Sequence, residues 1–332
     1  MSKLPASVSP TVEAVYQSYE RGRESFRPHL GASLIGRECE RELWYTFRWC
    51  SAPRHSGRML RLFETGQREE ERFVENLRAI GVEVHDRDEE TGRQFGFSDF
   101  GGHFAGSIDG AALGIIEAPK TWHLLEFKTY NARRFELLKR HGVKVASPEH
   151  YSQMVVYMDY LGFTRAFYLS VCKDSDELYA ERLHADPAFA ALLKEKARRI
   201  IAAATPPMKL SEDPAWWKCR YCDHRAVCHE GQPAEVHCRS CLHSTPVMEG
   251  ESGLSACSAQ AGWRCEKHCQ MLSKAEQERG CSDHLYIPPL LSGEVVDAGD
   301  DFVKYRFADG TTLRNGRGGM SSKAIRGQYA NS

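Results

Sequence analysis

The sequence predicts an α/β protein in which helices flank a central mixed sheet and a small cysteine-rich, metal-binding module follows. Three observations predict this arrangement. Residues 82–130 contain short β-like segments separated by Gly and Asp, whereas residues 58–80 repeat apolar side chains at helical intervals. Nine of the 12 cysteines lie between residues 219 and 281. With 332 residues, 42% of them hydrophobic, the chain is long enough for one large core or two modest ones.

The elements before the sheet are expected to be helical. We expect a helix over residues 12–19, then a dense apolar, aromatic and basic stretch over 34–49. The aromatic side chains of that stretch favour core packing over base stacking, and they are Trp44, Tyr45, Phe47 and Trp49. A long helix over residues 58–80 is interrupted by Gly66 and stops at Gly81.

Strands and helices alternate beyond residue 82. The expected strands are VEVHD, RQFGFS, GHFAGSIDGAAL, HLLEFKTY, RAFYLSVC and ELYAERLH. Ser147, as a cap, and Pro148 predict a helix start, and Gly162 predicts its end. A further helix opens at Pro187 and ends before residue 206, and DFVKYRFADGTTL predicts a hairpin near the C-terminus.

Composition excludes several classes of protein. The longest apolar runs fall far short of a membrane-spanning helix, and the N-terminus has no signal-peptide pattern. We therefore expect no membrane partner and a cytoplasmic location, in a bacterium or a phage-infected host cell. The formal net charge of -1 gives no global basic field, so contact with nucleic acid would need a local basic groove.

Asp109, Glu126 and Lys128 form the most informative constellation. A strand alternates faces at every residue, so Glu126 and Lys128 point to one side while Phe127 points into the core. Two carboxylates beside a lysine suit a hard cation such as Mg²⁺ or Mn²⁺ and the hydrolysis of phosphodiesters. A surface ion pair is the plainer interpretation of an isolated E-x-K.

Further residues favour the functional interpretation. Gln153 and Tyr157 are four apart on an expected helix and share one face, where they could contact a phosphate or a base edge. The acidic run 69–71 could supply another carboxylate to a metal. Cys39 precedes Arg41 and Leu43-Trp44-Tyr45, and C-x2-C-x5-C follows much later in the chain at Cys219, Cys222 and Cys228.

The chain resembles the PD-(D/E)XK nucleases in the order of its motifs. This order is CxRxLWY, an acidic helix, an Asp strand, ExK, QxxxY and three cysteines. The resemblance is to the RecB-like iron-sulfur exonucleases, including CRISPR-adaptation, AddB-type and phage-encoded members. It covers about residues 31–230. It implies a restriction-endonuclease-like core and metal-dependent cleavage of DNA.

The resemblance also implies roles for individual residues. Asp109, Glu126 and the Phe127 carbonyl would bind Mg²⁺ or Mn²⁺, Lys128 would orient the attacking water, and Gln153 and Tyr157 would lie near DNA. Many relatives place a histidine on the preceding helix as an extra metal ligand. Here that position is Glu70, which we favour, or Glu69.

The cysteines are interpreted as two separate sites. The resemblance implies that Cys39 and the triplet Cys219, Cys222 and Cys228 hold one [4Fe-4S] cluster. The alternative is zinc bound by the triplet with His224 or His229.

A second site is expected in the later cysteines, because pairs spaced C-x2-C in a chain without an export signal favour metal over disulfides. The expected ligands of a structural Zn²⁺ are Cys238, Cys241, Cys265 and either Cys281 or His284. The competing candidates are Cys257, Cys269, His243 and His268.

These expectations divide the chain into four consecutive parts. They are an N-terminal helix and linker (1–30), a nuclease domain with the iron-sulfur cluster (31–232), a zinc module (233–290) and a hairpin with a tail (291–332). The expected function is a Mg²⁺- or Mn²⁺-dependent DNA exonuclease that processes ends for recombination or repair. By analogy with the family, a single-strand annealing protein or a helicase would be its partner, and a ring-shaped oligomer would fit.

Three other functions remain as alternatives. An endonuclease would keep the same site. A non-catalytic, regulatory DNA-binding protein would keep the fold and use the zinc module for contact, although it would not need both carboxylates. An iron-sulfur redox protein is disfavoured because no G-x-G-x-x-G motif follows a strand.

Overall fold

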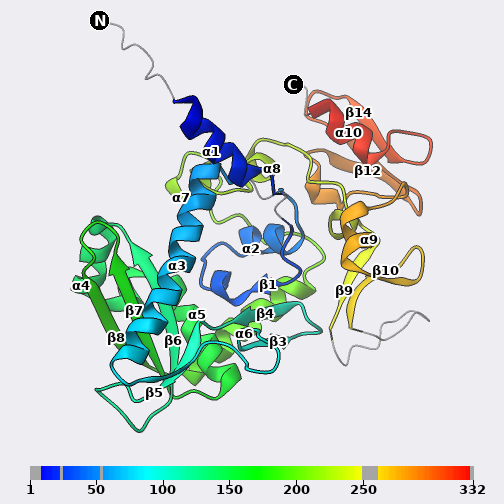
Figure 1. The fold of residues 1–332 in the computed structure, drawn as a ribbon. Coiled ribbons are helices and arrows are strands. Elements are labelled where there is room, and N and C mark those ends of the chain that lie inside the picture. The colour runs from blue at the N-terminus through cyan, green and yellow to red at the C-terminus, as the bar shows by residue number, and fades with distance from the viewer. Residues whose placement is uncertain (1–8, 23–24, 53–54, 249–260, 330–332) are drawn as a thin grey trace, which may run out of the picture. The chain divides into compact units, whose positions relative to one another are not determined.

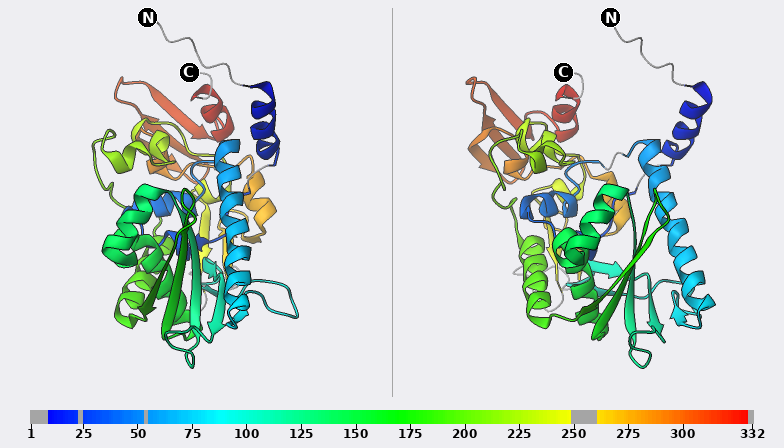
Figure 2. Two further views of the ribbon diagram at one scale, coloured as in Figure 1. Left: turned by 60° about the vertical axis from the view of Figure 1, so that its left-hand side comes forward. Right: turned by 90° about the vertical axis from the view of Figure 1, so that its left-hand side faces the viewer.

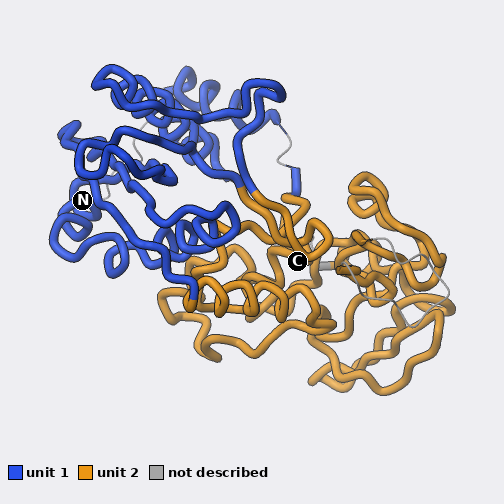
Figure 3. The backbone as a smooth tube through the Cα atoms, turned by 90° about the horizontal axis from the view of Figure 1, so that it is seen from below, with its two compact units in different colours: residues 1–26, 53–96, 107–187 blue, residues 27–52, 97–106, 188–332 orange. Residues whose placement is uncertain are grey.

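The computed structural model describes residues 9–22, 25–52, 55–248 and 261–329 (Figure 1). They form two compact units, each assembled from separate stretches of the chain (Figure 3). Unit 1 contains residues 1–26, 53–96 and 107–187, and unit 2 contains residues 27–52, 97–106 and 188–332. The division into four consecutive parts stays a prediction.

Unit 1 is built on a five-stranded sheet with the order β2-β5-β6-β7-β8. Only β6 and β7 run parallel in this sheet, and its other neighbouring strands are antiparallel. The predicted α/β class with a mixed sheet is therefore confirmed. The strands are β2 (Glu83–His85), β5 (Gly110–Leu113), β6 (His123–Tyr130), β7 (Arg165–Cys172) and β8 (Leu178–His184).

Helix α3 (Gly57–Ala79) covers one face of this sheet (Figure 2). The Ser56 side chain accepts the N–H of Met59 at 3.3 Å and caps the start of the helix. After the helix, Gly81 takes a positive φ of 85°, as the sequence predicts for a stop. Gly66 does not interrupt the helix, because the helix packs on the sheet after this residue and on α1 before it. The buried cluster beneath joins α3 to the sheet and contains Phe73, Val74, Leu77, Leu125, Phe127, Phe167 and Leu169.

Two helices pack against the other face of the sheet: α4 (Ala132–Ala146) and α5 (Pro148–Leu161). The sequence analysis predicted α5 and its Gly162 cap, but it missed α4. Ser147 precedes α5 without capping it, since its hydroxyl lies 2.8 Å from that of Tyr130 instead. In α4 the backbone breaks at Gly142 (φ 70°), and Glu181 of β8 accepts the N–H of Val143 there at 2.8 Å.

Helix α1 (Pro10–Glu20) completes unit 1 and packs along α3. The Tyr19 hydroxyl donates to the Glu64 carboxylate, which joins the two helices. The predicted N-terminal helix is therefore confirmed.

Unit 2 contains three small sheets, with the orders β1-β4-β3, β11-β10-β9 and β12-β13-β14. The β-like run 82–130 is thus divided between sheets, since β3 and β4 do not join β5 and β6. The strands of unit 2 are β1 (Leu30–Gly31), β3 (Gly96–Asp99), β4 (Phe104–Ser107), β9 (Ser244–Val247), β10 (Gly262–Cys265), β11 (Gln270–Leu272), β12 (Glu294–Gly299), β13 (Phe302–Arg306) and β14 (Thr312–Gly316). Its helices are η1 (Ala32–Leu34), α2 (Glu40–Phe47), α6 (Pro187–Ala202), α7 (Trp217–Arg220), α8 (Arg225–His229), η2 (Cys238–Ser240), α9 (Lys274–Arg279), η3 (Pro288–Leu290) and α10 (Ser322–Tyr329).

Aromatic side chains of residues 44–49 form much of the core of unit 2, as predicted. Trp44, Tyr45, Phe47 and Trp49 are all buried. The Arg239 guanidinium lies 3.7 Å from the centre of the Trp49 ring and donates to the Phe47 carbonyl at 3.0 Å. These contacts tie the segment around α2 to η2.

No helix in the described part of the chain is long and apolar enough to cross a bilayer.

Substitution by alanine should change the stability of the protein in opposite directions at two glycines of unit 1. Gly162 has φ 74° and no atom within 4 Å of the position of a Cβ, so Gly162→Ala meets only backbone strain and should destabilise the protein by about 1 kcal/mol. Gly66 is equally uncrowded but helical, so Gly66→Ala should stabilise by about 0.5–1 kcal/mol. Urea unfolding measures both, and equal signs would contradict the assignment of these backbones.

Candidate active site

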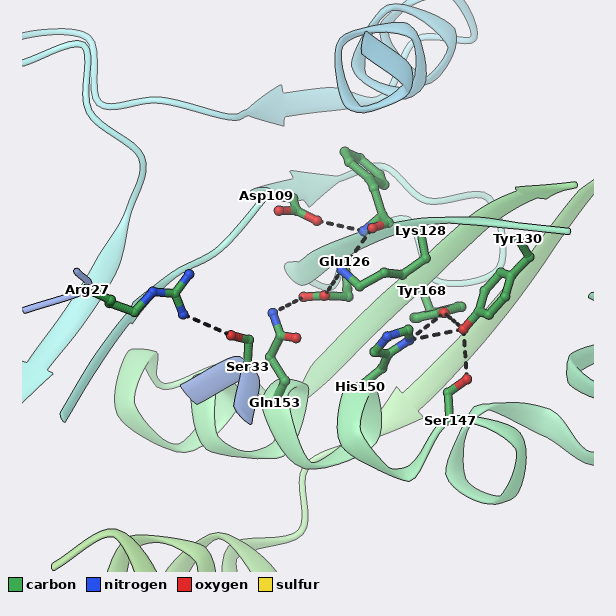
Figure 4. A network of polar contacts seen from close by, with 11 residues as sticks. Arg27, Ser33, Asp109, Glu126, Lys128, Tyr130, Ser147, His150, Gln153 and Tyr168 are labelled. Carbon is green, nitrogen blue, oxygen red and sulfur yellow. Dashed lines mark hydrogen bonds and ion pairs between the residues drawn. The ribbon is translucent and has the colours of Figure 1, made fainter. Parts of the chain in front are cut away.

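Asp109 stands immediately before β5 and is held against β6. Its Oδ2 accepts the backbone N–H of Phe127 at 2.7 Å (Figure 4). This bond leaves the second oxygen, Oδ1, for another partner. The Phe127 ring lies in the hydrophobic core and packs 5.0 Å from the ring of Phe73, as the alternation of the strand predicts.

Glu126 is completely buried in the middle of β6. The Lys128 ammonium donates to its Oε1, and the Gln153 amide of α5 donates to its Oε2 at 3.2 Å (Figure 4). Lys128 also donates to the Phe127 carbonyl at 3.0 Å, and its side chain remains 26% exposed. The structure therefore brings the predicted Glu126 and Lys128 together on one face of the strand.

Glu70 of α3 shares the electrostatic environment of this group. Burial and the nearby Asp109 charge raise the pKa of Glu70 to about 7. Burial raises the pKa of Glu126 to about 7 against the opposing effect of Lys128. The pKa of Lys128 is raised although burial opposes the shift, because Glu126, Asp109 and Glu70 favour its charged form.

The two acidic candidates on α3 differ in their partners. Glu69 forms an ion pair with Arg72 at 3.5 Å. Glu70 instead interacts with Asp109 and Lys128. These contacts favour Glu70 over Glu69 as the additional carboxylate.

This donor set fits Mg²⁺ or Mn²⁺. Three carboxylates surround a single lysine, so the group carries surplus negative charge that a divalent cation would offset. The carboxylate oxygens and the Phe127 carbonyl are hard ligands. Within the described residues, however, no three or more His, Cys, Asp or Glu side chains form a ready-made group that could hold a metal ion.

Gln153 and Tyr157 both point into the protein. Gln153 is 8% exposed and Tyr157 is 2% exposed. Burial and then the Glu126 charge raise the pKa of the Tyr157 phenol. Gln153 donates to Glu126, and Tyr157 is hydrogen-bonded to Gln153. Contact of either residue with DNA stays a prediction.

A buried polar cluster next to the site was missed from the sequence. The Tyr130 hydroxyl lies 2.6 Å from the Tyr168 hydroxyl and 3.0 Å from Nδ1 of His150 (Figure 4). Burial, then Lys128 and Arg134, lower the pKa of His150 to about 3, so its ring is neutral. The alternation along β6 could have indicated Tyr130, but Tyr168 depends on the pairing of Glu126 with Tyr168 between β6 and β7.

The first cysteine group is brought together within unit 2. Cys39 caps α2, where its sulfur accepts the N–H of Glu42 at 3.4 Å. Burial is the main cause that raises the pKa of each thiol of the triplet, and Cys39 adds to the rise in all three: Cys219, Cys222 and Cys228. Cys39 thus acts electrostatically on three thiols that lie about 180 residues later in the sequence, although no three such side chains of the described residues form a ready-made metal group.

His224 does not suit the zinc alternative for this group. Its Nε2 lies 2.9 Å from the Thr46 hydroxyl, and its Nδ1 lies 3.0 Å from the Ser51 hydroxyl. Both ring nitrogens thus have partners. These contacts favour Cys39 as the fourth neighbour of the triplet.

The second cysteine group also converges in unit 2. The four cysteines predicted for zinc line one small cavity together with His243, His268 and His284. Cys269 is disulfide-bonded, which removes it from the competing candidates. Cys257 lies outside the described residues.

The chain belongs to the PD-(D/E)XK nuclease superfamily, whose family model matches residues 14–229. The match includes the carboxylate site and the first cysteine group, and it ends before Cys238. No curated protein matches the chain.

Among solved structures, the chain is similar to LHK-Exo, an alkaline exonuclease from Laribacter hongkongensis, with 18% identity and a TM-score of 0.36, covering 56% of this chain and 91% of that one. For LHK-Exo in complex with dAMP the identity is 17% and the TM-score 0.38, over 57% and 91% of the two chains. The structure of SSO0001 matches at 12% identity and a TM-score of 0.40, over 66% and 96%.

The hydrogen bond between Asp109 and β6 should contribute to the stability of the fold, whatever role Asp109 has in the reaction. Asp109→Ala leaves the Phe127 N–H without its acceptor and should destabilise the protein by about 1–3 kcal/mol. Asp109→Asn keeps a carbonyl acceptor and should cost less. Urea denaturation of both variants checks the order, and equal changes in the free energy of unfolding would mean that only the charge of Asp109 matters.

Proposed function

We propose that this nuclease-superfamily protein is a Mg²⁺- or Mn²⁺-dependent DNA exonuclease that processes DNA ends for recombination or repair. The observation that carries the proposal is the convergence of Asp109, Glu126 and Lys128 across β5 and β6, with Glu70 beside them. A protein that only binds DNA has no need to bury a carboxylate such as Glu126 among other carboxylates, because this arrangement opposes contact with phosphate.

Glu70, Asp109, Glu126 and the Phe127 carbonyl would hold the ion. When bound, the ion supplies Lewis-acid polarisation of the scissile phosphate and offsets the charge on the departing oxygen. Gln153 holds the Glu126 carboxylate in place through its hydrogen bond to Oε2. Each carboxylate oxygen of Glu126 accepts one hydrogen bond and keeps a lone pair for a ligand.

Lys128 is positioned to orient the attacking water. An ammonium has three N–H donors, and two of its contacts are the Glu126 carboxylate and the Phe127 carbonyl. The third N–H can donate to a water molecule and hold its lone pair toward phosphorus. The high pKa keeps Lys128 a donor at neutral pH, so its role is to position the water and to stabilise negative charge.

Cleavage of labelled DNA tests the proposal. Glu126→Gln and Lys128→Met should each lower the rate of cleavage of linear DNA in Mg²⁺ or Mn²⁺ by about 100- to 1,000-fold, because each removes a charge that acts on the reacting phosphate. The matched controls are Glu177→Gln and Lys139→Met, which break an exposed ion pair of 2.7 Å on the same unit. These controls should keep the wild-type rate.

Closed circular DNA separates the alternatives in the same assay. An exonuclease leaves circles intact, whereas cleavage of circles would keep the site and make the protein an endonuclease. Binding of DNA without cleavage in either metal would favour the regulatory DNA-binding alternative. Equal losses in the Lys128 and Lys139 variants would remove Lys128 from the mechanism.

We also infer that Cys39, Cys219, Cys222 and Cys228 bind a [4Fe-4S] cluster with a structural role. The support is the approach of Cys39 to all three thiols of the triplet. Such ligation would connect segments that are distant in sequence and would restrict the unfolded chain. A helicase or annealing partner, and an oligomer, remain proposals by analogy.

Iron content tests this cluster. Cys39→Ala should remove most of the iron and the brown absorbance from anaerobically purified protein, because the cluster would lose one of its four protein ligands. Cys50→Ala is the control, since Cys50 is fully buried in the same unit and is not among the four. Stoichiometric zinc without iron at this group would instead support the zinc alternative.

A further inference from the structure

We propose that Cys238, Cys241, Cys265 and Cys281 together bind a single zinc ion, at a structural site separate from the nuclease centre. The four cysteines lie beyond residue 229, where the match to the nuclease superfamily ends. They belong to one unit, and the site does not depend on the chemistry proposed for Asp109, Glu126 and Lys128.

Regular backbone or a turn next to it positions each of the four cysteines. Cys238 begins the short helix η2, and the Cys241 N–H donates to the Cys238 carbonyl at 2.9 Å, a tight turn of the kind that carries a C-x2-C metal knuckle. Cys265 ends β10 and is paired with Ser244 of β9. Cys281 follows α9, whose start is fixed by a reciprocal capping box between Ser273 and Glu276.

All four cysteines line the same cavity, whose volume is about 10 Å³. A space of this size is about what one water molecule or one ion requires, and it is too small for a multi-iron cluster. Four cysteines that line one cavity supply the number and type of ligands typical of structural zinc. The size of the cavity therefore favours a single ion.

The four thiols do not yet form a ready-made metal group among the described residues. A cysteine side chain rotates about its Cα–Cβ bond, so binding of an ion would be accompanied by rotation of these side chains around the cavity that they line.

Two buried histidine nitrogens in the same cavity indicate a polar occupant. Nδ1 of His284 and Nε2 of His243 are buried and have no hydrogen-bond partner among the described residues. His284 is 2% exposed, and its other nitrogen lies 3.1 Å from the Ser240 hydroxyl. Unsatisfied buried imidazole nitrogens are costly, and N–H groups beside zinc-bound thiolates are a common supporting contact.

The cysteines of this group are free, although Cys269 in the same unit is disulfide-bonded. A disulfide framework would be expected to pair them, whereas a metal site needs all four as thiolates. Lys267 also lines the cavity, and its ammonium donates to Asp301 at 2.5 Å.

Elemental analysis of the purified full-length protein tests the proposal. We expect one zinc per chain that withstands dialysis against EDTA. Cys238→Ala and Cys281→Ala should each lower the zinc content at least about 10-fold. Cys50→Ala, at a buried cysteine that does not line the cavity, should retain it. Cys39→Ala should also retain zinc even if it loses iron, which separates this proposal from the iron-sulfur one.

A second measurement does not depend on the folding of variants. In the wild-type protein, replacement of zinc by Co²⁺ should produce the visible bands of tetrahedral, thiolate-bound cobalt. The four cysteines should then react with iodoacetamide more slowly in the metal-loaded protein than after removal of the metal, as mapped by mass spectrometry.

Several results would overturn the proposal. They are the absence of stoichiometric zinc, loss of zinc in Cys39→Ala with retention in Cys238→Ala, iron in place of zinc at these cysteines, and alkylation at the same rate with and without metal. Loss of zinc in His284→Asn but not in Cys281→Ala would show that the four-cysteine ligand set is wrong.

Discussion

The pairing of β6 with both of its neighbours is the constraint on which the candidate site depends. β6 runs antiparallel to β5 and parallel to β7. Because its side chains alternate, one face carries Glu126, Lys128 and Tyr130, while Phe127 packs against α3 on the other. A shift of one residue in register would place Phe127 among the polar groups and Glu126 in the apolar core.

The environment of this strand explains the balance of charge at the site. The sheet and helix α5 remove Glu126 from water, and the cost of burying its charge is offset by Lys128 and Gln153. Asp109 and Glu70 then add negative charge beside one lysine. This excess of negative charge around one lysine is the feature on which the proposed metal site depends.

Local signals predicted the elements well, and long-range pairing was harder to predict. The apolar repeat in α3, the alternation in β6 and the glycine after α5 each depend on a few adjacent residues, and each was predicted from the sequence. Helix α4 was missed because Gly142 breaks its backbone and basic residues obscure its apolar spacing. The separation of β3 and β4 from β5 depends on pairing with β1, which no local pattern specifies.

In the candidate site, too, local features were predicted and long-range packing was not. Asp109, Glu126 and Lys128 were predicted as site residues from spacing and from the family resemblance. The structure pairs Lys128 with Glu126 and bonds Asp109 to the backbone N–H of Phe127. The burial of Gln153 against Glu126, and the cluster of Tyr130, His150 and Tyr168, depend on how α5 and β7 meet β6. The spacing of residues in the sequence does not show how these elements pack against one another.

The buried Arg239 side chain has a consequence for how this chain can be divided. Its three hydrogen-bond acceptors are neutral: the carbonyls of Phe47 and Pro28 and the amide oxygen of Gln277. Its guanidinium also stacks against the rings of Trp49 and Trp263. A protein ended after residue 232 would lose this side chain, uncover the aromatic faces around α2 and leave the Phe47 carbonyl without this donor. The residues beyond the family match therefore contribute to the core of unit 2, and a fragment that ends at residue 232 is expected to be less stable than the full chain.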